Sequence, residues 1–98
     1  MTESVASFTI KYAFQVTGRG FFIIGEILSG TIKIGMKADF SGIGINKMLT
    51  IDTIEFELHK EGDKAWEEVG LGFSGFTETE KELLKTQSPF ITPISIIK

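Results

Sequence analysis

Cysteine is absent from this 98-residue chain, and only one histidine is present. Without cysteine the chain has no disulfide, no thiolate metal site and no cysteine nucleophile. The sequence also shows no Ser/His/Asp arrangement and no cluster with metal-ligand spacing. We therefore expect a non-enzymatic protein with no metal and no cofactor.

Long hydrophobic runs are missing as well. Residues 1–4 (Met-Thr-Glu-Ser) carry neither the basic region nor the apolar region of a signal peptide. No apolar run approaches the length that crosses a bilayer. From these features we expect a soluble, cytoplasmic protein without a membrane partner.

Positive charge is scarce and unevenly placed. The net charge is −3, with five bases and four acids in residues 1–54 but nine acids and five bases in residues 55–98. Arg19 is the single arginine. An acidic chain without a basic run lacks the usual electrostatic footprint of a strong nucleic-acid binder.

What the chain does have is apolar material. Hydrophobic residues make up 42% of it, and nine of them are Phe. A chain of this length buries roughly 65% of its unfolded surface, which is enough for one core. We therefore expect a single domain over residues 1–98, with residues 1–7 as a frayed N-terminus.

Two segments predict strands at the start of the fold. In residues 8–16 apolar side chains alternate with polar ones, which places Phe8, Ile10, Tyr12, Phe14 and Val16 on one predicted face. Residues 20–28 break this rule, because apolar side chains occupy both faces. One of those faces is expected in the core, and the other lies under a neighbouring element or is left for a partner.

The rest of the chain predicts further strands and one helical turn. Residues 36–40 and 47–59 read as strands, the second with a phase slip at Asp52-Thr53 that is typical of a β-bulge. In residues 69–75 glycines occupy one face and leave room against the backbone. A capping box at Thr77 and Glu80 predicts a helical turn over residues 77–85 that docks on the barrel. Two prolines place residues 90–98 at an edge or a barrel lip. Short strands and Gly-rich turns favour a closed β-barrel.

Several of these landmarks have matching spacing in one known family. The chain resembles the β-barrel domain 2 of translational GTPases such as elongation factor Tu, at Gly18-Arg19-Gly20, Gly25, Gly30 to Gly35, Ile54-Glu55-Phe56, Val69-Gly70-Leu71 and Gly75. The resemblance covers most of residues 8–92. It implies an all-β, closed, six-stranded Greek-key barrel that here stands alone.

In that family the barrel follows a GTPase domain and helps to hold aminoacyl-tRNA or the small ribosomal subunit. This chain has no phosphate-binding loop, so GTP is not expected as a ligand. Glu26 and Leu58 stand where the family commonly has basic residues. Glu55 is retained where the family's acidic residue packs against the terminal adenine of tRNA.

Two functions from different classes follow. The first is a binding module that docks a protein partner or a second copy through apolar strand surface and loops, with candidate residues Phe21, Phe22, Ile24 and Phe76. The alternative is a translation-related protein that binds RNA, tRNA or the ribosome, with candidate residues Lys11, Arg19, Lys33, Lys37 and Glu55. His59 near Glu57 and Glu61 is interpreted as a surface histidine rather than an acid–base or metal residue.

Overall fold

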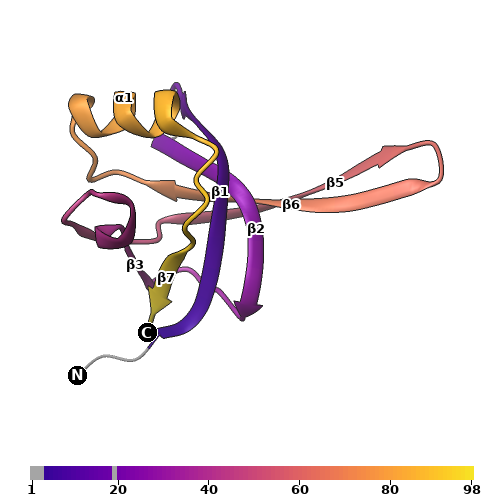
Figure 1. The fold of residues 1–98 in the computed structure, drawn as a ribbon, viewed down its shortest axis with the longest axis horizontal. Coiled ribbons are helices and arrows are strands. Elements are labelled where there is room, and N and C mark those ends of the chain that lie inside the picture. The colour runs from indigo at the N-terminus through magenta and orange to yellow at the C-terminus, as the bar shows by residue number, and fades with distance from the viewer. Residues whose placement is uncertain (1–3, 19) are drawn as a thin grey trace.

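The computed structural model describes residues 4–18 and 20–98 and shows an all-β fold with one helix (Figure 1). Within these residues seven strands form one antiparallel sheet in the order β4-β3-β7-β1-β2-β6-β5. The strands are β1 (Ser4–Val16), β2 (Gly20–Gly30), β3 (Lys37–Asp39), β4 (Met48–Thr50), β5 (Thr53–Glu61), β6 (Lys64–Phe73) and β7 (Ile94–Ile97), joined by a short 3₁₀ helix η1 (Ser41–Ile43) and helix α1 (Glu78–Gln87). The prediction of an all-β fold is confirmed.

The sheet does not close by pairing its two ends, β4 and β5. These ends are separated in the chain by only two residues, Ile51 and Asp52. The Ile51 N–H donates to Met36 O at 2.8 Å, whereas the Asp52 N–H donates to Gly72 O at 2.9 Å. The chain therefore passes from the β3 side to the β6 side at this point. The predicted strand 47–59 is divided here, next to the predicted phase slip, which raises the strand count from six to seven.

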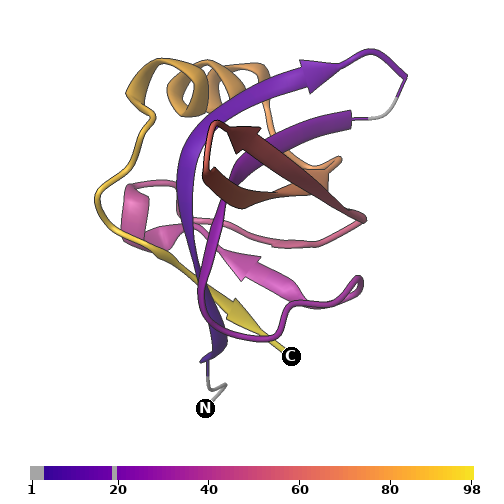
Figure 2. The same ribbon diagram turned by 90° about the vertical axis from the view of Figure 1, so that its right-hand side faces the viewer.

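A β-bulge in β1 overturns the predicted face of residues 8–16. Ile10 pairs with Gly25 and Tyr12 pairs with Ile24 in the backbone register. Lys11 is therefore an extra residue that has no register partner on β2. The bulge reverses the side chains that follow it. Phe8 and Ile10 are buried in the core, whereas Tyr12 and Phe14 lie half-exposed on the opposite face. The ribbon shows that β1 and β2 are long, curved strands (Figure 2).

Strands lie near both ends of the described part of the chain. Of the predicted frayed segment 1–7, residues 1–3 lie outside the described residues, whereas residues 4–7 belong to β1, and Ala6 is buried between Gly30 of β2 and Ile96 of β7. The C-terminal segment was expected at an edge or a barrel lip. Its strand β7 instead lies between β1 and β3 and pairs with both, because the prolines precede the strand.

The core lies on the inner face of the sheet and is built around phenylalanines. Phe21, Phe40, Phe73 and Phe76 meet edge to face, with ring centroids 5.0–5.6 Å apart. This geometry suits the aromatic quadrupole. Helix α1 covers one end of this core through Leu84, which is fully buried.

Helix α1 begins as the sequence predicted. The Thr77 hydroxyl accepts the Glu80 N–H at 3.2 Å, and the Glu80 carboxylate accepts the Thr77 N–H at 2.8 Å. Lys47 Nζ adds an ion pair to Glu80 at 2.7 Å. These bonds hold the pKa of Glu80 below its ordinary value, the bond from Lys47 having the largest effect.

The β5–β6 hairpin projects from the body of the protein along its longest dimension, 42 Å (Figure 1). The base of the hairpin lies on the core, whereas Phe56 and Leu58 farther out are about 60% exposed. They lie on the same strand face as Ile54, which packs against the core, but the core ends before it reaches them.

Candidate partner-binding groove

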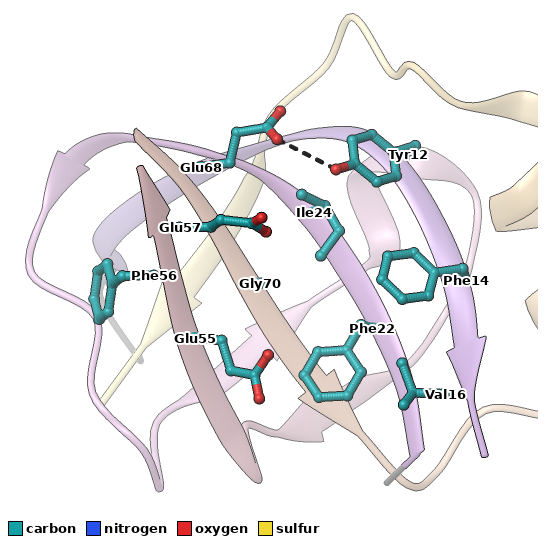
Figure 3. Close-up of a pocket in the computed structure, with 10 residues that line it drawn as sticks. All are labelled: Tyr12, Phe14, Val16, Phe22, Ile24, Glu55, Phe56, Glu57, Glu68 and Gly70. Carbon is teal, nitrogen blue, oxygen red and sulfur yellow. Dashed lines mark hydrogen bonds between the residues drawn. The ribbon is translucent and has the colours of Figure 1, made fainter. Parts of the chain in front are cut away.

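A groove of about 380 Å³ opens on the outer face of the sheet (Figure 3). It lies opposite the core, across β1, β2, β6 and β5. Ten residues from these four strands line it: Tyr12, Phe14, Val16, Phe22, Ile24, Glu55, Phe56, Glu57, Glu68 and Gly70. Its volume falls in the range typical of ligand sites in proteins.

One wall of the groove is apolar and comes from β1 and β2. The ring of Phe14 stacks on Tyr12 on one side and on Phe22 on the other, with centroids 6.1 and 6.4 Å apart. Phe22 is only 2% exposed although it is outside the core. The sequence predicted free space over the glycines of β6, and the Phe22 ring occupies that space. A Cβ atom built at Gly72 would lie only 3.0 Å from the ring, so the ring can pack this closely because Gly72 has no side chain.

The opposite wall carries three carboxylates. Glu55 and Glu57 extend from alternate positions of β5, and Glu68 comes from β6, opposite Glu57 in the register. Figure 3 shows the carboxylates of Glu55 and Glu57 pointing across the groove, whereas the Phe56 ring points away from it. Among residues 4–18 and 20–98, no ion pair involves Glu57.

Glu68 anchors a polar network at one end of the groove. Its side chain is 11% exposed, and it accepts a hydrogen bond from the Tyr12 hydroxyl at 3.2 Å (Figure 3). Lys11 Nζ lies 3.8 Å from Glu68 and 2.9 Å from Glu26. The hydrogen bond to Glu26 is the main reason that the pKa of Lys11 is raised. Burial, followed by the Glu68 charge, raises the pKa of Tyr12.

His59 lies beside this network rather than in the groove lining. Its Nε2 atom is 2.8 Å from Glu68 Oε1, but the orientation makes no hydrogen bond, and this buried nitrogen has no other partner. The imidazole stacks on Trp66 at 5.4 Å. The sequence had grouped His59 with Glu57 and Glu61. In the described part of the chain no group of three or more His, Cys, Asp or Glu residues is placed to hold a metal ion.

The predicted partner-binding residues fall on two faces of the sheet. Phe22 and Ile24 line the groove. Phe21 and Phe76 were predicted at the same surface, but the structure buries both in the core, where their rings are 5.6 Å apart. Their side chains are therefore not accessible to a partner.

The predicted RNA-binding residues do not form one described cluster. Lys11 belongs to the network on β1, and Glu55 lies in the groove. Lys33 is exposed in the loop before β3, and Lys37 is exposed on β3, which β7 separates from β1. Arg19 lies outside the described residues.

Sequence reasoning missed the residues that complete the groove. Tyr12 and Phe14 were assigned to the same face as Phe8 and Ile10, because the bulge at Lys11 has no mark in the sequence pattern. Glu68 was not among the predicted site residues. The alternation of residues along β6 held a signal that could have placed Glu68 in the groove. Glu68 shares a strand face with Gly70 and Gly72, and Phe22 lies beside these two glycines.

No protein-family model matches this chain, and no solved structure matches it significantly. The resemblance to the translation-factor barrel thus stays a prediction. Within the described residues, no helix combines the length and the apolar character that crossing a membrane requires.

Proposed function

We propose that this chain is a non-enzymatic binding module that takes a protein partner in the groove across β1, β2, β6 and β5. The observation that carries the proposal is the aromatic stack of Tyr12, Phe14 and Phe22 on a surface face, next to a cavity. Aromatic side chains are enriched at interfaces, where they supply contact area with few rotatable bonds. Tyr12 and Phe14 are 42% and 40% exposed, so a partner can reach them.

We further propose that the module is a barrel of the translation-factor domain 2 type. Two landmarks of the resemblance and one feature of the sheet support it. Gly18 and Gly20 flank the turn between β1 and β2, both with positive φ. A Cβ atom at Gly25 would collide with the carbonyl oxygen of Thr9, so that position requires glycine. The two ends of the sheet are joined by only Ile51 and Asp52, which suits a sheet that curls toward closure.

RNA or ribosome binding is the weaker proposal. Among the described residues, the charged side chains that line the groove are carboxylates, which repel a phosphate backbone. Lys11, which lies beside Glu68 of the groove, already pairs with Glu26 and Glu68. RNA binding would predict an affinity that falls steeply with salt.

Affinity purification with matched baits tests the proposal. The three baits are the native chain, Phe14→Ser in the groove and Ile91→Ser in a loop, where Ile91 is 98% exposed. We expect proteins captured by the native chain to be retained by Ile91→Ser and lost by Phe14→Ser. Equal retention by both variants, or equal loss, would contradict the proposal. Circular dichroism of each bait checks that it is folded.

Sedimentation at micromolar concentration separates a foreign partner from a second copy. We expect the purified chain to sediment as a monomer if its partner is another protein. A dimer that Phe14→Ser converts to monomer would identify the second copy as the partner. A dimer that survives Phe14→Ser would place self-association on another surface and count against the groove.

A further inference from the structure

We infer that the groove binds an arginine or lysine side chain of a basic, extended partner segment. The inference rests on the proposed function, and it adds the chemistry of the occupant. It is carried by three features of the groove: its charge, its aromatic wall, and its position beside a strand edge without a strand partner.

The charge of the groove selects a cation. Glu55, Glu57 and Glu68 line it, and none of the lining residues that the structure describes is basic. Lys11 approaches Glu68 from the rim and offsets part of the charge at that end of the groove. Glu57 points into the groove and has no ion pair within the described residues. The hairpin adds to this field, because residues 55–68 carry six acids and two lysines.

The aromatic wall narrows the choice to a cation with an apolar stem. The rings of Tyr12 and Phe14 face the cavity from β1, and Ile24 extends the apolar wall along β2. Arginine and lysine place their methylene stems on apolar surface while the charged head reaches carboxylates. A guanidinium also stacks on aromatic faces. A phosphate or a carboxylate gains from neither wall.

The strand edge favours a peptide over a free small cation. β5 is the last strand of the sheet and pairs only with β6 in the part of the chain that the structure describes. Its other edge therefore offers main-chain hydrogen bonds to an added strand. Side chains on the outer face of such a strand lie about 5 Å from Glu55 and Glu57, as cross-strand neighbours. Opposite charges at such positions stabilise the pairing.

A titration with a defined peptide tests the inference. The probe is an amidated, acetylated Thr-Arg-Thr-Arg-Thr-Arg-Thr peptide, and its control has Gln at each Arg position. Isothermal titration measures the Kd, and amide chemical shifts of the protein locate the site. We expect the Arg peptide to bind with shifts concentrated on β5 and at Gly70. We expect the Gln peptide to bind at least about tenfold more weakly.

Two variants with the same loss of charge separate a local contact from the general field. Glu57→Gln alters the groove, whereas Glu82→Gln alters an exposed carboxylate on α1. We expect Glu57→Gln to weaken the Arg peptide about fivefold and Glu82→Gln to leave its affinity unchanged. Equal effects of the two variants, or equal affinity for the two peptides, would overturn the inference.

The remaining outcomes are also decisive. Binding of an adenine-rich oligonucleotide in the groove, tighter than the Arg peptide, would replace the cationic occupant with RNA. If no peptide binds but Phe14→Ser still loses a captured protein that Ile91→Ser retains, the inference fails and the proposed function stands. If the two baits also behave alike, the proposed function fails with it.

Discussion

The two faces of β2 show how one strand serves both the core and the groove. Phe21 and Ile23 enter the core, where they are at most 1% exposed. Phe22 and Ile24 lie on the other face, beside the carboxylates of β5 and β6. The first pair packs within the hydrophobic core, whereas the second pair borders a cavity.

The difference comes from what each face packs against. On the inner face Phe73 and Phe76 fill the space with rings. On the outer face Gly70 and Gly72 offer bare backbone, so Phe22 sinks against β6 and a hollow remains between it and β5. Burial of Phe22 is therefore compatible with an open groove beside it, and the two faces respond differently to substitution.

The largest expected effect lies on the inner face. Phe73→Ala removes a fully buried ring that packs edge to face on Phe40 and Phe76. We expect the free energy of unfolding to fall by about 3–5 kcal/mol, because a cavity remains where the ring was. Urea denaturation followed by fluorescence measures it. A loss below about 1 kcal/mol would show that the inner face is not the core.

The second largest expected loss of stability comes from substitution of a glycine of β6 on the outer face. In Gly72→Ala the added methyl group would lie 3.0 Å from the Phe22 ring and 3.2 Å from the Thr53 side chain. We expect a loss of about 1–3 kcal/mol from overpacking. Phe22→Leu introduced into Gly72→Ala should recover part of that loss, since the side chain that lies against Gly72 becomes smaller. Strict additivity in a double-mutant cycle would contradict this account of Phe22.

Helix α1 belongs to the inner-face layer, and its cap gives a smaller effect. Thr77→Ala removes the hydroxyl that accepts the Glu80 N–H. We expect a loss of about 1 kcal/mol in the free energy of unfolding. Thr77→Ser keeps the hydroxyl and serves as the control. Equal losses in the two variants would show that the cap bond does not stabilise the helix.

The same cap predicts a dependence of stability on pH. The pKa of Glu80 is held below its ordinary value by Lys47 and by the Thr77 N–H. A carboxyl group with a lowered pKa stabilises the fold above its unfolded pKa, near 4.5, and this contribution is lost as the pH falls through the folded value. Thermal melting should therefore separate native protein from Glu80→Gln at pH 7. The separation should shrink by pH 3, and an unchanged gap would contradict the assignment.

Much of the fold could be predicted from the sequence, because its signals are local. The capping box at Thr77 and Glu80 depends on two residues at fixed spacing, and it is confirmed. The two apolar faces of residues 20–28 were also visible, and the structure places Phe21 and Phe22 on opposite faces. The break of the strand at Asp52 was marked by its change of phase.

The groove was harder to predict, since it depends on pairing between distant strands. An extra residue at Lys11 reverses Tyr12 and Phe14, and only the register with β2 reveals it. Phe76 has the same apolar character as Phe22, but its chain position after β6 turns it into the core. Glu68 was missed for a similar reason: it accepts a hydrogen bond from Tyr12, which is 56 residues away in the chain.

One paired measurement tests the central claim, that recognition belongs to the outer face and stability to the inner face. Phe14→Ser and Phe73→Ala are compared by urea denaturation and by affinity for the captured partner, under conditions in which both variants are folded. We expect Phe14→Ser to lower the free energy of unfolding by about 1 kcal/mol, since its ring is half-exposed, and to abolish binding. Phe73→Ala should lose at least about 3 kcal/mol and bind as the native chain does. Equal binding by Phe14→Ser and the native chain would contradict the account.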